Sequence, residues 1–333
     1  MQTVIGIDVS KYKLDCAYFG DSQKQKSNKM QCKNDLGTFE SILIWAEALT
    51  KKPRKSLIFI IEPTSIYHEL LVRFLFEAGA TVYLVNPARV RKFAEGIGIL
   101  SKNDVIDADV LTRYGLMATN LTAYSPSLPE IEALRSLMNR LDALEDALRR
   151  ETNRQEKVGK TTVIHPLEKK SIARFIKQLE KEIAQFKKSI RQVVNESPLL
   201  KQSYELLISI PGIGEKTAWL MMIVLGLQDF ENASSVASFL GLNPIEKRSG
   251  KSEYRRPRLS KRGNSRYRQA LYFPAMVATR KNPDIQAQYD RLTQAGKSKM
   301  CALGAAMRKL VHICYGVIKH QEPYQAQVSM DRT

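Results

Sequence analysis

The sequence predicts an α/β domain at the N-terminus, two long helices in the middle and a mostly α-helical domain at the C-terminus. Short apolar runs rich in β-branched residues alternate with helical patterns in the first third. A leucine repeat with helical spacing follows, and amphipathic helical patterns resume after it. We therefore expect domains at 1–125, 126–197 and 198–325. A tail at 326–333 should follow, in a chain that packs loosely after Pro323.

The first domain is predicted around one central strand, residues 3–10, because its apolar side chains point to both faces. Runs at 13–20 and 24–33 complete an antiparallel meander, and buried strands follow at 56–62 and 80–85. Three strands and then alternating helix and strand is the order of a ribonuclease-H-like mixed sheet. The pattern alone leaves this as one α/β option among several.

Carboxylates stand at the ends of two of these strands, Asp8 and Glu62, where open α/β sheets place their chemistry. Asp104 and Asp107 lie three residues apart at the start of a predicted helix and therefore share one face. Like charges so placed repel one another unless a cation compensates them. The alternatives are a turn cap or backbone amides for Asp8, and the helix N-terminus with solvent for the helical pair. Four such carboxylates together favour a metal site.

The composition favours a polyanionic partner. The net charge is +18, and residues 200–333 hold 21 Lys or Arg against 10 Asp or Glu. This predicts nucleic acid before membrane. The four cysteines form no close C-x-x-C pair, so neither a zinc site nor a disulfide framework is expected. No leader pattern opens the sequence, and the longest uncharged apolar run, 217–227, is too short to span a bilayer.

The middle segment carries a heptad seam of leucines, followed after His165-Pro166 by a second apolar repeat with the same spacing. Two amphipathic helices of this kind form an antiparallel coiled-coil hairpin or the seam of an oligomer. The sequence does not separate the two. We favour an oligomer, because a narrow seam leaves little other core to bury it. The leucines of the first repeat are Leu134, Leu137, Leu141, Leu144 and Leu148.

Two segments of the last third are candidates for contact with nucleic acid. Pro211-Gly212-Ile213-Gly214 lies between two apolar helical patterns and resembles a helix-hairpin-helix element, in which backbone amides approach a phosphate. A tight turn without a ligand is the alternative. Pro211, Gly212, Gly214 and Lys216 are the candidate contacts there. Residues 247–268 then hold ten cations against one acid, a density that would repel itself without a polyanion. These cations are Lys247, Arg248, Lys251, Arg255, Arg256, Arg258, Lys261, Arg262, Arg266 and Arg268.

Ser249 stands inside this basic segment, between Arg248 and Gly250. Neighbouring cations suit a hydroxyl that attacks phosphorus, because they stabilise the negative charge that develops. A serine that only binds a phosphate from a basic loop is the stronger interpretation from these residues alone. Ser252 and Ser260 lie close by and are alternatives for the same role.

Six motifs in this order resemble the DEDD transposases of insertion-sequence family 110, which include related site-specific DNA invertases. The resemblance covers nearly the whole chain. The motifs are Gly6-Ile7-Asp8-Val9-Ser10-Lys11, Ile61-Glu62-Pro63-Thr64, Lys102-Asn103-Asp104-Val105-Ile106-Asp107-Ala108, Pro211-Gly212-Ile213-Gly214, Gly241-Leu242-Asn243-Pro244 and Arg248-Ser249-Gly250.

The resemblance implies a RuvC-like N-terminal domain, a coiled coil and a C-terminal transposase domain. Asp8, Glu62, Asp104 and Asp107 would be its catalytic metal ligands, and Ser249 its nucleophile. Four carboxylates suit Mg²⁺, two ions of which would hold the attacking and leaving oxygens, and Mn²⁺ would substitute. The implied partners are donor and target DNA, a structured guide RNA (bridge RNA) and further copies of the chain, as a dimer or tetramer. The expected location is the bacterial cytoplasm, at the nucleoid during the reaction.

Three functions compete. The first is a recombinase that cuts and rejoins DNA through a phosphoserine link. The second is a structure-specific, metal-dependent nuclease of Holliday-junction type that uses water. The third is a nucleic-acid-binding protein without catalysis. A covalent protein–DNA adduct separates the first from the second, and metal-dependent cleavage excludes the third.

Overall fold

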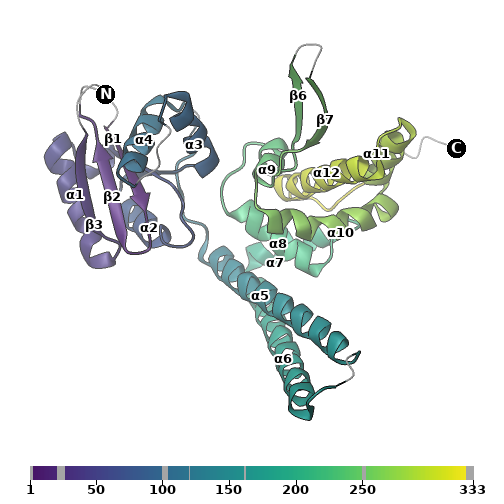
Figure 1. Cartoon of the computed structure of the whole chain (residues 1–333). Coiled ribbons are helices and arrows are strands. Elements are labelled where there is room, and N and C mark those ends of the chain that lie inside the picture. Colours follow the sequence, from purple (N-terminus) through teal and green to yellow (C-terminus); the bar gives the residue numbers. More distant parts are fainter. Residues whose placement is uncertain are drawn as a thin grey trace. The chain divides into compact units, whose positions relative to one another are not determined.

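A computed structural model describes residues 3–20, 27–99, 104–119, 121–160, 163–249 and 253–327. Within these ranges, the side chains of 104–106, 246–249 and 253–257 are not described. The chain divides into two compact units, Met1–Pro126 and Ser127–Thr333 (Figure 1). The two long central helices belong to the second unit, where the sequence suggested a domain of their own.

The first unit is built on a five-stranded sheet in the order β3-β2-β1-β4-β5. β1, β2 and β3 form an antiparallel meander, and β4 and β5 run parallel to β1. The mixed sheet with a central first strand, predicted from the sequence, is therefore confirmed. The strands are β1 (Thr3–Val9), β2 (Lys13–Tyr18), β3 (Asn28–Lys33), β4 (Leu57–Ile61) and β5 (Thr81–Leu84).

Helices cover both faces of this sheet because β1 and β4 bury apolar side chains on each side. Ile5 and Ile7 point into one core, which also contains residues of α1 (Leu36–Thr50) and α2 (Glu69–Glu77). Val4 and Ile60 point into a second core, with residues of α3 (Pro87–Gly96) and α4 (Asp104–Met117). The sheet thus lies between two helical layers.

α4 is fixed closely against the sheet at Gly6. A Cβ atom at Gly6 would collide with the carbonyl oxygen of Ala108 and lie 2.6 Å from the amide nitrogen of Thr112, so only glycine fits there. The amide of Gly6 donates a hydrogen bond of 2.9 Å to Thr112 Oγ1, and the same hydroxyl lies 2.9 Å from the carbonyl oxygen of Ala17 on β2. These contacts determine where the N-terminus of α4 lies relative to β1.

The second unit is mostly helical, as predicted. Its long helices α5 (Pro129–Val158) and α6 (Pro166–Glu196) pack along each other as a hairpin (Figure 1). Leu134, Leu141 and Leu144 of the leucine seam are buried in the same core as residues of the following helices. Leu137 and Leu148 are partly buried against the same core, so the seam packs within one chain, and the oligomer remains a prediction. The remaining helices are α7 (Pro198–Ile208), α8 (Glu215–Gly226), α9 (Ala233–Phe239), α10 (Ser265–Lys281), α11 (Pro283–Gln294) and α12 (Lys299–His320).

The basic segment is not the loop that its charge suggested. It forms an antiparallel β-hairpin from β6 (Pro244–Ser249) and β7 (Glu253–Leu259). Ser249, the last residue of β6, pairs with Glu253, the first residue of β7.

The end of the chain is held in place as far as Gln327, so the expectation of loose packing after Pro323 is wrong for this stretch. The hydroxyl of Tyr324 donates a hydrogen bond of 2.6 Å to the buried carboxylate of Asp284 on α11. The amide of Tyr324 donates to Ser209 Oγ at 2.8 Å, and the amide of Gln327 donates to Asp284 at 3.1 Å. A buried carboxylate needs such donors, and this segment supplies them.

One helix in the described part of the chain, α12, is long and apolar enough to cross a membrane. Half of its apolar window is buried inside the structure, and the helix packs against α9, α10 and α11. This is the pattern of a core helix.

Candidate active site and nucleic-acid interface

Four polar residues form a row across the sheet of the first unit. Asp8 of β1 pairs with Asp15 of β2, and Asp15 pairs with Gln31 of β3. Ile7 pairs with Ile61 of the parallel strand β4, which brings Glu62 next to Asp8 on the other side. Residues directly opposite each other in neighbouring strands share one face of a sheet. The row Gln31, Asp15, Asp8, Glu62 therefore lies on the face that Gly6 shares, which α4 covers.

The first turn of α4 extends toward this row. Gly115, near the C-terminal end of α4, lies against Val4 and Ile60, and Ala108, nearer its N-terminus, lies over Gly6. The N-terminal end of α4 therefore lies closer to Asp8 than its C-terminal end does. Asp104 lies one turn, or about 5–6 Å, before Ala108. Asp8 lies two strand residues, or about 6–7 Å, beyond Gly6. The fold thus carries the first turn of α4 to the level of Asp8.

Of the four predicted metal ligands, the structure describes the side chains of three. Asp8, Glu62 and Asp107 are partly buried, and each interacts with another group of the chain. Among the described side chains, no group of three Asp, Glu, His or Cys residues could by itself hold a metal ion, and the side chain of Asp104 is outside that set. The chemistry of the donors, carboxylates on one face of the sheet and on the helix over it, fits Mg²⁺. The metal assignment remains a prediction.

Asp15 is a residue of this row that sequence reasoning missed. It is only 6% exposed, and an open recess of about 310 Å³ lies beside it, lined in part by Gln31, Lys29 and Ala108. The signal was present in the sequence, because a tight connection between strands 3–10 and 13–20 places Asp15 opposite Asp8.

The β6–β7 hairpin concentrates positive charge. Lys247 of β6 pairs directly with Arg255 of β7 in the register of the two strands. Arg258 of β7 is exposed to solvent, as are Lys261 and Arg262 after the hairpin. The side chains of the other predicted contacts in this segment are not described, so their roles remain predictions: Lys247, Arg248, Ser249, Lys251, Arg255 and Arg256.

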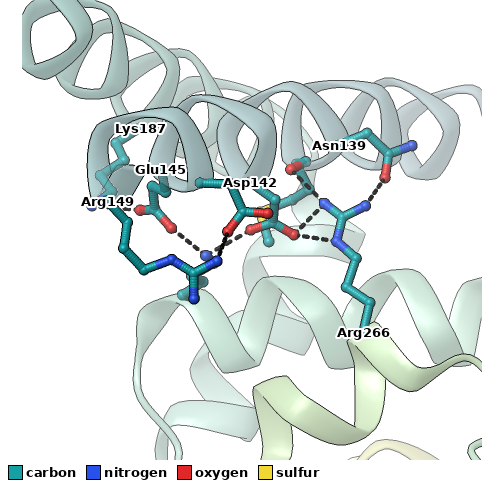
Figure 2. A network of polar contacts seen from close by, with 9 residues as sticks. Asn139, Asp142, Glu145, Arg149, Lys187 and Arg266 are labelled. Carbon is teal, nitrogen blue, oxygen red and sulfur yellow. Dashed lines mark hydrogen bonds and ion pairs between the residues drawn. The ribbon is translucent and has the colours of Figure 1, made fainter. Parts of the chain in front are cut away.

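Two of the predicted DNA contacts form ion pairs within the second unit. Figure 2 shows Arg266 of α10 bound to Asp142 and Asn139 of α5; its Nε donates to Asp142 Oδ2 at 2.6 Å and its Nη1 to Asn139 Oδ1 at 2.9 Å. The ammonium of Lys216, on α8, lies 2.6 Å from Asp142 Oδ1 and also pairs with Glu145. We call this cluster of Asn139, Asp142, Glu145, Lys216 and Arg266 the α5 joint, because it fastens α5 to α8 and α10.

The electrostatics of Lys216 show how strongly the joint holds it. Partial burial works to lower the pKa of its ammonium, and the hydrogen bonds and charges of Asp142 and Glu145 outweigh burial, so that the pKa is raised. The stability that this pairing contributes is present at neutral pH and is lost only as the pH rises through that raised pKa. Glu145 also pairs with Lys187 of α6 at 3.2 Å, which extends the joint to both hairpin helices (Figure 2).

Arg268 and the glycine-rich turn also have structural roles. Arg268 donates to the carbonyl oxygens of Gly263 at 2.5 Å and Leu240 at 3.4 Å, next to the base of the β6–β7 hairpin. Gly212 has φ +103°, and a Cβ atom there would lie 2.8 Å from Cβ of Ala278 on α10. Packing therefore explains Gly212 without a ligand, while a phosphate contact at Pro211, Gly212 or Gly214 remains a prediction.

Two family profiles and two relatives relate the chain to the IS110 transposases and DNA invertases. A family profile of the DEDD type of IS110, described as Transposase, matches residues 5–163, and a second, described as Transposase IS116/IS110/IS902 family, matches residues 204–290. The pilin gene-inverting proteins of Moraxella lacunata and Moraxella bovis are each 30% identical to the chain over 329 residues. That alignment spans 98% of the chain and 99% of each relative.

Proposed function

The chain belongs to the IS110 family of DNA transposases and recombinases, and from this premise we propose that it cuts and rejoins DNA through a covalent phosphoserine link. The proposed metal ligands are Asp8, Glu62, Asp104 and Asp107, and the proposed nucleophile is Ser249. The Moraxella relatives are named for inverting a pilin gene, which is a rearrangement of this kind.

The observation that supports the carboxylate assignment best is the alignment of Asp8 on β1 with Glu62, which directly follows the parallel strand β4, with α4 anchored over the same face. The sheet and α4 hold these positions close together, as a site for phosphoryl transfer requires. A bound Mg²⁺ would supply charge stabilisation to the phosphate oxygens during the displacement. The residues of the chain orient the site and keep its carboxylates on one face.

The chemistry proposed for Ser249 follows from its hydroxyl. Its oxygen forms a bond to phosphorus as the bond from phosphorus to one strand oxygen breaks. The hydroxyl proton leaves to a basic group, and the released strand oxygen ends as a hydroxyl. The phosphoester is retained in the protein–DNA link, so attack by another strand end can reseal the DNA without an energy source. The cations around Ser249 stabilise the charge that develops on phosphorus oxygens.

The partners follow from the same proposal. Donor and target DNA are the substrates, and a structured guide RNA would select them, as the family resemblance implies. The excess of cations in residues 200–333 supports nucleic-acid partners. A dimer or tetramer would supply the second copy of the serine that exchange of both strands requires.

A suicide substrate tests the proposal. DNA nicked near the exchange point should leave the wild-type protein joined to DNA in a denaturant-resistant adduct, which requires Mg²⁺. The adduct should be absent in Ser249→Ala and in Asp107→Ala and should persist in Ser260→Ala. Cleavage with free ends by Ser249→Ala would instead identify water as the nucleophile and a nuclease as the function. An adduct that persists in Ser249→Ala and disappears in Ser252→Ala would move the role to Ser252.

A further inference from the structure

The row on the first sheet contains one more carboxylate than the proposed function uses. Asp15 stands directly opposite Asp8, and side chains at such positions have Cβ atoms about 5 Å apart. Both are acids on one face, and Asp15 is almost fully buried. Two like charges in this position destabilise a strand pair. Their presence therefore requires compensation from inside the chain or from a bound cation.

The chain itself provides part of this compensation. Gln31 Nε2 donates to Asp15 Oδ1 at 2.6 Å, and Lys13 Nζ lies 3.3 Å from Asp15 Oδ2. Both oxygens of Asp15 are thus already engaged and oriented. The side chain of Lys13 is 40% exposed, so solvent screens its pairing with Asp15. Asp8 lies between Asp15 and Glu62 in the row.

From this geometry we propose that Asp15 is a positioning residue for the cation site: a fixed carboxylate that acts through Asp8 and strengthens cation binding without being a ligand. The inference rests on the proposed function, which assigns Asp8 to that site. The partners of Asp15 come from β2 and β3, the meander side of the row, whereas Glu62 and α4 lie on the other side of Asp8.

A purely structural role makes a different prediction. If Asp15 only clamps β2 to β3 through Gln31, an amide at position 15 serves nearly as well, and cation affinity does not depend on its charge. If it acts through Asp8, removing its charge weakens cation binding. Removing the charge of Lys13, which offsets Asp15, strengthens binding. The two substitutions then change cation affinity in opposite directions.

The test uses the full-length protein and Mn²⁺ alone, titrated by calorimetry and followed by thermal unfolding with and without the ion. Asp15→Asn keeps the shape and the acceptor for Gln31. It should raise the Mn²⁺ dissociation constant roughly 10-fold, the lower end of what changes around metal ligands cause. Without Mn²⁺ its Tm should be unchanged or higher, because a repulsion is lost. Lys13→Met should lower the dissociation constant. Glu40→Gln on α1 removes a carboxylate that pairs with Arg54. It should change neither the Mn²⁺ dissociation constant nor the Tm.

Each outcome is decisive. A lower Tm without Mn²⁺ in Asp15→Asn, together with wild-type affinity in both Asp15→Asn and Lys13→Met, would make Asp15 a structural clamp and overturn the inference. Absence of Mn²⁺ binding by the wild-type protein would overturn the proposed metal site, and the inference with it. Strand cleavage by Asp15→Asn that recovers as Mg²⁺ is raised would support a role in binding the ion.

Discussion

The carboxylates of the first unit and the cations of the second were both identified from charge in the sequence, and the structure treats them differently. Asp8 and Glu62 fall on neighbouring strands, with a further acid, Asp15, opposite Asp8. Lys216 and Arg266 instead meet acids of α5, which lie 71 and 124 residues away in the chain. In the first unit acids lie next to one another on one sheet face, although Lys13 pairs with Asp15 there. In the second unit each of these cations lies against an acid.

This difference supports the proposed cation site in the first unit. Neighbouring acids on one sheet face destabilise strand pairing, so the proposed cation would stabilise the row. A cation that already holds two carboxylates gains little from a phosphate, because an existing pair must be broken first. Charge density alone therefore overstates the number of phosphate contacts in the second unit.

The largest effect is expected at the carboxylates. Asp8→Asn and Asp107→Ala should each reduce strand cleavage by at least ~100-fold, the scale of losing one group that stabilises a transition state. Binding of the same DNA, measured by fluorescence anisotropy, should remain within a few-fold. Asp109→Asn is the matched control, because its carboxylate also lies on α4 and instead pairs with Lys29 at 2.9 Å. Near wild-type cleavage by Asp107→Ala would remove that residue from the site.

The cations of the hairpin should give the next largest effect. Replacing Arg255, Arg256 and Arg258 together by Ala should flatten the dependence of log affinity on log salt by roughly one unit per lost phosphate contact. Arg266→Ala removes a cation that is held in the α5 joint and should leave the slope unchanged. DNA binding titrated at several salt concentrations measures both. If Arg266→Ala flattens the slope and the triple replacement does not, the footprint lies on the joint and not on the hairpin.

The fold of the first unit could be predicted further than its site. Apolar runs with β-branched residues locate β1 and β4, because each fully buried strand is recognisable by itself. Asp15 was missed because its neighbours look ordinary until the register of β1 and β2 is worked out. Asp8 and Glu62 could be predicted because the end of a strand is recognisable from the neighbouring residues in the sequence.

The second unit shows what local patterns leave out. The pairing of Asp142 with Arg266 depends on how α5 and α10 pack, and no spacing in the sequence encodes it. The hairpin β6–β7 was taken for a loop because its charge hides the strand pattern. The docking of Tyr324 on Asp284 likewise depends on the fold, since a single tyrosine after a proline carries no signal.

The smallest predicted effect concerns the α5 joint and tests whether its cations are structural. Asp142→Asn leaves the partly buried cations Lys216 and Arg266 without their shared partner. The unfolding free energy should fall by about 1 kcal/mol, because the side chains are 41–44% exposed for the cations and 21% for Asp142, and solvent screens such pairs. High salt should reduce this difference. Glu156→Gln breaks the exposed pair with Lys160 and should change stability less.

The same variant also reports on DNA. With Asp142 neutralised, Lys216 and Arg266 are released for phosphates, so Asp142→Asn should bind DNA at least as tightly as the wild type, with a steeper salt slope. Denaturant unfolding and DNA titration on one preparation measure both quantities. Unchanged stability together with an unchanged slope would mean that the joint contributes nothing to the fold and holds no cation back from DNA. Lys216 and Arg266 would then be as available to DNA in the wild type as in the variant.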